Sequence, residues 1–384
     1  MVLARVWLLL GYYQQLKSLQ LRFTQKRDNV RPVKTGQHHF IIFILLFILL
    51  PVITMTTVGC KKSSISSEGG HVLVQIPNSN NGNYEMQVVE LTTIRDLTHL
   101  YGDAARFYVE PSFFNNEVTG ENPNLRLMKT KDDVYVALDS LSLQLLALYY
   151  QFEKLMVLDQ ALGVKTTNVW PQKVAVNARI ISNEEFKENN AAYSSAFNVF
   201  LFVPYTNPDL PLMVNVGVVG HEHFHSLFDK MVIAPLGQKF PTSAEKDFYH
   251  YVLMRGVNEG LADVWGWVVS GDNDFVGRSL PSERKARRLD SKERSLYTRA
   301  ELRGNLQQLP LKNGTAVAYL LGARLARSIV GVQELRKSKT QKSDIQIRME
   351  IANALIKTLP EIKKLIESKY QVPEKKSEEA VLDK

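Results

Sequence analysis

The pattern of apolar and polar residues predicts strands in the first part of the chain. Short runs of β-branched and aromatic residues alternate with turn-forming stretches between residues 84 and 136. One more short strand is expected at 71–76, and two others at 168–180 and 198–203. The N-terminal part of the folded region is therefore expected to be rich in β-structure.

Apolar residues at helical spacing predict that helices dominate the rest of the chain. The expected helices are 136–162, 214–232, 257–270, 316–330 and 343–370. The charged stretch 283–303 is expected to form solvated surface. The pattern predicts an α+β fold, with a β-rich N-terminal part, a central helix and a mostly helical C-terminal lobe.

The positive charge is concentrated in the first 59 residues. The chain has 47 Lys and Arg against 39 Asp and Glu, for a formal charge of +8. Residues 1–59 hold 7 of the basic and 1 of the acidic side chains, which leaves 40 (47 less 7) against 38 (39 less 1) for the remainder. The small net charge of this remainder gives no reason to expect a nucleic-acid partner.

An apolar run that ends at the single cysteine, Cys60, resembles an export signal. Basic residues precede the run 40–59, and a Lys- and Ser-rich stretch follows it. Cysteine directly after Val-Gly resembles a bacterial lipoprotein signal, in which the cysteine is acylated. Thr57 departs from the leucine usual in that motif. The alternative is an uncleaved membrane helix, for which 20 residues suffice. Either reading anchors the protein to a membrane in the cell envelope, with the later residues outside the cytoplasm.

These features divide the chain into five parts. They are a basic prefix with the signal or anchor (1–59), a lipidated cysteine with a flexible tether (60–82), an N-terminal lobe that ends in the central helix (83–232), a helical C-terminal lobe (233–372) and a disordered charged tail (373–384).

The run 220–225 reads Gly-His-Glu-His-Phe-His and contains the pattern H-E-x-x-H. Residues four apart lie on one face of a helix, so His221 and His225 can bind one metal ion. Glu222 is placed to take a proton from a water at the open position of that metal. His223 is two residues from each ligand, so it is expected to point away and not to bind.

A third ligand is expected from Glu259, which follows in the run Asn-Glu-Gly-Leu-Ala-Asp. A catalytic zinc site needs three protein ligands and one open position. Asp263 lies one helical turn after Glu259, from where it can accept a hydrogen bond from the far nitrogen of a ligand imidazole. An acidic pair near a helix start can also serve the helix dipole alone. Finding both motifs in this order favours the metal site.

The pattern HExxH followed by NExxxD resembles the glutamate-zincin metallopeptidases, most closely the thermolysin-like family, with some neprilysin-like features. Asn190, Ala191 and Tyr193 stand in a segment that resembles the family's substrate-binding edge strand. Asp229 and Asn258 match positions that support the metal site in that family. The resemblance is confined to about 136–330. It implies a zincin-type catalytic domain, one catalytic Zn²⁺ and a peptide or protein substrate.

The chain departs from this family where the oxyanion is stabilised. The family uses a histidine well after the glutamate ligand and a tyrosine before it, yet no histidine follows His250 here. Tyr249 and His250 are candidates for one donor. The other role would fall to a residue such as Tyr297, Arg299 or Arg303. The acidic run 272–274 is too weak a signal to predict a calcium site.

Three classes of function fit the sequence. The first is a zinc metallopeptidase, and the intact Glu222 favours it. The second is a non-catalytic zinc-containing envelope lipoprotein that acts as a binding or scaffold protein, which the missing histidine would explain. The third is an adhesion protein that carries the motif without binding zinc.

Overall fold

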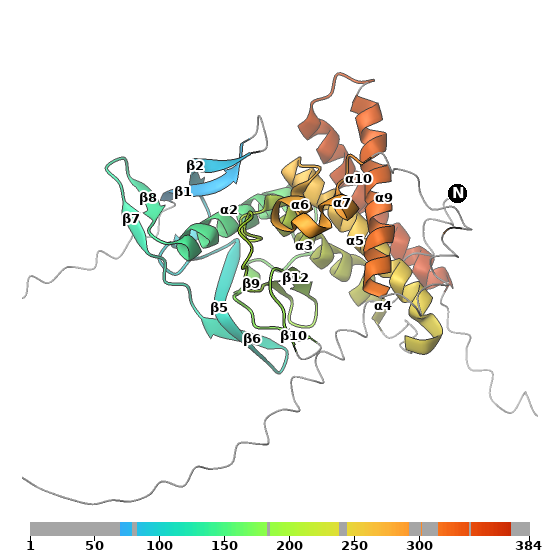
Figure 1. The fold of residues 1–384 in the computed structure, drawn as a ribbon, viewed down its shortest axis with the longest axis horizontal. Coiled ribbons are helices and arrows are strands. Elements are labelled where there is room, and N and C mark those ends of the chain that lie inside the picture. Colours follow the sequence, from blue (N-terminus) through green and yellow to red (C-terminus); the bar gives the residue numbers. More distant parts are fainter. Residues whose placement is uncertain are drawn as a thin grey trace, which may run out of the picture.

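Strands fill the first half of the folded chain and helices the second half (Figure 1). This mixed α and β composition agrees with the predicted class. The computed structural model describes residues 70–78, 83–182, 185–237, 244–291, 301, 314–337 and 339–369. The predicted signal or anchor segment, Cys60 and the charged tail lie outside these ranges.

Two sheets carry most of the strands. One has the order β2-β1-β8-β7 and the other the order β12-β13-β9-β5-β6. The strands are β1 (Gly70–Pro77), β2 (Tyr84–Leu91), β3 (Ile94–Asp96), β4 (Tyr101–Gly102), β5 (Ala105–Phe114), β6 (Glu117–Glu121), β7 (Leu127–Lys129), β8 (Val134–Ala137), β9 (Gln172–Val176), β10 (Ile181–Ser182), β11 (Glu185–Phe186), β12 (Ala191–Ser194) and β13 (Val199–Phe202). β3 pairs with β4, and β10 pairs with β11, in two small ribbons.

The helical elements begin with α2, which contacts strands of both sheets (Figure 1). They are α2 (Ser140–Ala161), α3 (Val216–Phe228), the π-helical turn η2 (Asp229–Ile233), α4 (Ala234–Leu236), α5 (Ala244–Ser270), α6 (Phe275–Ser279), the 3₁₀ turn η4 (Pro281–Glu283), α7 (Arg284–Arg287), α9 (Gly314–Lys337) and α10 (Asp344–Lys369). Among the described residues, no helix is both long and apolar enough to cross a membrane.

The strand predicted at 71–76 is confirmed as part of β1, but it does not lie in a free tether. β1 is an interior strand that pairs with β2 on one side and β8 on the other. Its side chains alternate, as a strand with one buried face requires, and Val72 and Val74 are fully buried. The folded part therefore includes residues that the sequence assigned to the flexible segment 60–82.

The N-terminus of α3 is fixed from several directions. The side-chain oxygen of Asn215 accepts hydrogen bonds from the first backbone amides of the helix, as an N-cap residue does. Its amide group donates to the Phe275 carbonyl oxygen at 2.7 Å and to the Ser279 hydroxyl at 2.8 Å. The Tyr84 hydroxyl accepts from the Val216 amide at 3.0 Å. The helix that carries the HExxH motif is thus held by β2 and by α6.

α5 lies between α3 and α9 and contacts both. Glycines allow these close approaches, because an added methyl group would collide with the facing backbone. On the α3 side, a Cβ at Gly266 would lie 2.6 Å from the Gly217 carbonyl oxygen. On the α9 side, a Cβ at Gly260 would lie 2.5 Å from the Gly322 carbonyl oxygen. The three helix axes are therefore brought close together around Glu259.

Several predicted boundaries were wrong. The helix expected from residue 257 begins at Ala244, so it is far longer than predicted. The helix expected over 214–232 is α-helical only to Phe228 and continues as the π-helical turn η2. The strand expected over 168–180 is limited to β9, and Asn177, which directly follows it, has a positive φ of 54°.

Candidate metal centre

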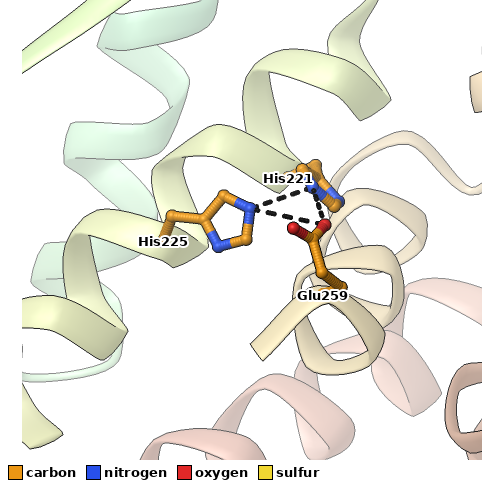
Figure 2. Close-up of side chains that lie close together, drawn as sticks. All are labelled: His221, His225 and Glu259. Atoms are coloured by element: carbon orange, nitrogen blue, oxygen red, sulfur yellow. Dashed lines mark hydrogen bonds and ion pairs between the residues drawn. The ribbon is translucent and has the colours of Figure 1, made fainter. Parts of the chain in front are cut away.

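Three buried side chains from α3 and α5 place one potential ligand atom each in a small space (Figure 2). The Nε2 atoms of His221 and His225 are 3.0 Å apart. Oε2 of Glu259 lies 3.3 Å from the former and 3.8 Å from the latter. The helical spacing of four residues explains why both imidazoles lie on one face, as predicted. The three residues could hold a metal ion.

The donor set fits such an ion. Oε2 of Glu259 is buried and receives no hydrogen bond of good geometry from the described residues. A buried carboxylate oxygen without a donor is costly, and a cation at the centre of the three atoms would satisfy it. Two imidazoles and one carboxylate form a ligand set that is typical of catalytic zinc sites.

Each imidazole is also held through its other ring nitrogen. Nδ1 of His225 lies 3.0 Å from Oδ1 of Asn258. Nδ1 of His221 lies 3.0 Å from Oδ1 of Asp263. Both partners come from α5, next to Glu259 or one turn beyond it. Such contacts fix the tautomer and leave Nε2 directed at the metal position.

Two arginines and a tyrosine surround these residues on the side of α9. Arg287 forms an ion pair with Asp263, and its Nη2 atom lies 3.4 Å from Nδ1 of His221. Nε of Arg255 lies 3.7 Å from Oε1 of Glu259, one helical turn away on α5. The guanidinium carbons of Arg255 and Arg287 lie 5.5 and 5.0 Å from the centre of the Tyr319 ring.

The charges of this cluster shift the pKa values of its members in opposite directions. Burial lowers the pKa of His221, but the neighbouring carboxylates of Asp263 and Glu259 outweigh it and raise the value to about 9. Burial and the charge of His221 hold the pKa of His225 below its usual value. Burial raises the pKa of Glu259, but His221 and His225 outweigh this effect and lower it. A metal ion must therefore displace a proton from His221.

Glu222 lies beside this cluster and faces strand β12. It is buried, and its Oε2 atom accepts a hydrogen bond from the Tyr193 backbone amide at 2.8 Å. The same strand contains Ala191, and Asn190 directly precedes it with an exposed side chain. The structure thus brings Glu222 and the predicted substrate-binding segment into direct contact.

His223 points to the opposite side of α3, as predicted. Its Nε2 atom lies 3.3 Å from Oδ2 of Asp159 and 3.1 Å from Nδ2 of Asn168. Its ring stacks on Trp265, with 6.1 Å between the ring centres. His223 is therefore part of a polar network behind the helix, in which its Nδ1 atom and Oδ1 of Asp159 have no hydrogen-bond partner among the described residues.

For the remaining predicted site residues, the structure describes no contact with the three ligands. Asp229 ends α3 and touches none of the three ligands in the described contacts; burial raises its pKa to about 6. Tyr249 and His250 lie on α5, but their side chains are outside the described part. The alternatives Tyr297, Arg299 and Arg303 also lie outside the described residues. Asp272 and Asp274 pair with Arg278 and Arg284.

Sequence reasoning missed three residues of this site. Arg255 is four residues before Glu259, and this spacing on one helix could have identified it. Arg287 and Tyr319 come from α7 and α9, and their sequence neighbourhood contains no comparable signal. Only the packing of α9 against α5, and of α7 against α9, brings them to the ligands.

The comparisons with known proteins leave the functional assignment to this geometry. No protein-family model matches the chain, and no curated protein matches it.

Proposed function

We propose that the protein is a zinc-dependent metallopeptidase of the thermolysin-like, glutamate-zincin type. The observation that carries the proposal is the convergence of two imidazoles and one carboxylate, with Glu222 beside them. A purely structural metal site has no need of a general base. A buried glutamate between such a ligand set and a strand edge is the arrangement that peptide hydrolysis requires.

The ligands would be His221, His225 and Glu259, and the ion they would hold is zinc. Imidazole nitrogen and carboxylate oxygen are ligands that suit zinc, and three protein ligands leave a position open. A zinc ion bound there supplies a Lewis acid for the scissile carbonyl and lowers the pKa of water. Asn258 and Asp263 would keep both imidazoles oriented for binding.

Glu222 would act as the general base. Its carboxylate takes a proton from the attacking water and passes it to the leaving amine when the C–N bond breaks. The amide of Tyr193 occupies one carboxylate oxygen of Glu222 and so fixes the orientation of the group. The other oxygen would take the proton from water.

Strand β12 would bind the substrate along its outer edge. It stands at the end of its sheet and pairs only with β13 among the described strands. The Asn190 carbonyl oxygen accepts from the Val203 amide, so the backbone of Ala191 is directed to the other side by strand alternation. An extended peptide can add there and satisfy its own backbone groups.

The test is the hydrolysis of a quenched fluorescent peptide library by the full-length protein and by Glu222→Gln. We expect the variant to lose about 10²–10⁴-fold in rate while its zinc content stays unchanged. Glu121→Gln, at an exposed position on β6, is the control and should retain full activity. Undiminished hydrolysis by Glu222→Gln would show that the proposed mechanism is wrong.

A second candidate is a non-catalytic zinc-containing lipoprotein that binds a partner. The lack of any histidine after His250 favours it, since the family uses one for the oxyanion. This candidate predicts stoichiometric zinc together with no hydrolysis by the wild-type protein above that of Glu222→Gln. The library digest therefore separates the two functions.

We also propose that acylation of Cys60 tethers the protein to a membrane of the cell envelope. The apolar run before this cysteine and the polar stretch after it support the proposal. Growth with an alkyne-labelled fatty acid should label the wild-type protein and leave Cys60→Ser unlabelled. Membrane association of an unlabelled protein would favour the uncleaved helix instead.

A further inference from the structure

Helix α9 lies directly against the turn of α5 that carries Glu259. A Cβ atom at Gly322 would lie 2.8 Å from the Gly256 carbonyl oxygen and 3.1 Å from Cβ of Glu259. Only a residue without a side chain permits this approach. The face of α9 that includes Gly322 is therefore fixed at short range to the metal ligand.

Tyr319 lies on that face, three residues before Gly322. Residues three apart lie on the same side of a helix, so Tyr319 stands about one turn from this close crossing. Its ring is held between Arg255 and Arg287, at 5.5 and 5.0 Å. Cation–π contacts of this kind are attractive and directional, so they fix the position of the ring.

Both arginines belong to the metal centre. Arg255 approaches Glu259 at 3.7 Å, and Arg287 pairs with Asp263 and approaches His221 at 3.4 Å. The ring of Tyr319 is thus oriented by the same groups that orient the ligands.

The contacts of its ring place Tyr319 beside the groups that approach Glu259 and His221. A tyrosine hydroxyl titrates near pH 10, so it is protonated at neutral pH and can donate a hydrogen bond. The residue is only partly buried, so it is not sealed in the core.

We propose that Tyr319 is a catalytic residue that donates a hydrogen bond to the oxyanion of the tetrahedral intermediate. The inference rests on the proposed function. The water oxygen forms a bond to the carbonyl carbon, its proton goes to Glu222, and the π electron pair moves to the carbonyl oxygen. Tyr319 stabilises this oxygen without losing its proton. When the C–N bond breaks, the electron pair returns to the carbonyl and Glu222 protonates the amine.

This role accounts for the departure of the chain from the thermolysin-like pattern. No histidine follows His250, so the donor that the family takes from a histidine has to come from another side chain. Tyr319 stands on a helix after the glutamate ligand and is fixed beside it. The adjacent arginines also place positive charge next to the developing negative charge.

The test compares the full-length wild-type protein with Tyr319→Phe. Phenylalanine keeps the ring between the two arginines and removes only the hydroxyl. We expect kcat on a peptide that the wild type cleaves to fall about 10²–10³-fold, with KM and zinc content unchanged. The affinity for a peptide phosphonamidate, whose tetrahedral phosphorus carries an oxyanion, should fall by a similar factor. The affinity for a peptide hydroxamate should change little, because it binds the metal without that tetrahedral group.

Tyr150→Phe is the matched control. Tyr150 is also a partly buried tyrosine under a cation, with Nζ of Lys154 at 4.8 Å from its ring, but it lies on α2. It should keep the wild-type kcat. Tyr319→His, which retains a donor, should recover part of the rate that Tyr319→Phe loses.

The outcomes separate this inference from the proposed function. An active wild type together with Tyr319→Phe within about threefold of its kcat overturns the role of the hydroxyl alone. Loss of zinc from Tyr319→Phe also overturns it, because the residue would then be structural. If the wild type cleaves no peptide faster than Glu222→Gln, the proposed function fails and the inference fails with it.

Discussion

The two sides of α3 each carry histidines in a buried polar cluster, yet only one side has the arrangement of a metal centre. On the front, His221 and His225 direct their Nε2 atoms at Oε2 of Glu259 (Figure 2). On the rear, His223 directs its Nε2 atom at Asp159 and Asn168. Burial and the residue types are therefore similar on both sides, and the convergence of ligand atoms is what differs.

The rear cluster is connected by hydrogen bonds in place of an ion. Asn168 donates to Asp159 at 2.7 Å and accepts from Ser226 and Lys230 at 3.2 and 3.0 Å. These contacts tie α3 to α2 and to the segment before β9. The rear cluster positions the helix, while the three ligand atoms of the front cluster could hold a metal ion. Each side can thus serve as the control for the other.

Removing a front ligand should have the largest effect. We expect His225→Ala to abolish the rise in melting temperature that zinc causes in the metal-free protein, because two ligands remain and binding stabilises only the folded state. His223→Gln should keep this rise. Thermal unfolding with and without zinc measures both, and an equal response of the two variants would remove the distinction between the faces.

The outer partner of a ligand should matter less than the ligand. Asp263→Asn keeps the size of the side chain that holds His221 but removes its charge. We expect zinc affinity to fall about 10–100-fold, because the imidazole loses its orienting carboxylate. Asp159→Asn makes the same change behind the helix and should leave affinity unchanged. Competition with a zinc-binding dye measures both values, and a larger loss for Asp159→Asn would reverse the assignment.

Disrupting the rear cluster should lower stability without removing the metal. His223→Gln leaves Asp159 buried with one fewer partner, and we expect a loss of about 1–3 kcal/mol in the free energy of unfolding. Urea titration of metal-free wild type and variant gives the difference. A variant as stable as the wild type would show that the rear network does not hold the helix.

We expect the smallest effect, a change of stability with pH, from Asp229 at the end of α3. Burial raises its folded-state pKa from 3.8 to about 6. Its contribution to stability is therefore fully present below about pH 4 and is lost as the pH rises through about 6. Asp229→Asn cannot ionise, so its stability relative to wild type should increase by about 1–2 kcal/mol between pH 4 and 7, since partial exposure screens the effect. A difference that does not change with pH would contradict this.

The local sequence pattern predicted the two histidine ligands on α3. The positions of the other residues of the site depend on tertiary packing. The spacing of His221 and His225 places both on one face of a helix in any fold. The helix expected from residue 136 begins later, at Ser140, because 136–137 belong to β8 and Asp139 caps α2 by accepting from the Ser142 amide. Tyr319 and Arg287 reach the ligands only through close helix crossings such as Gly260 against Gly322. No periodicity near either residue encodes that approach.

The early start of α5 shows a second reason why the sequence pattern did not predict part of the fold. Residues 244–256 mix charged and aromatic side chains and lack the apolar stripe that marked the segment from 257 onward. Val252, Leu253 and Met254 are nevertheless buried, so this part of α5 also packs into the core. The strand β1 was found by its alternating pattern, but its interior place in a sheet depends on pairing with β8, which comes much later in the chain.

The most direct test of the central claim is the metal content of the purified full-length protein, measured by plasma mass spectrometry beside that of His225→Ala. We expect close to one zinc per chain in the wild type and almost none in the variant. A wild-type protein without stoichiometric zinc, or a variant that holds as much metal as the wild type, would contradict it.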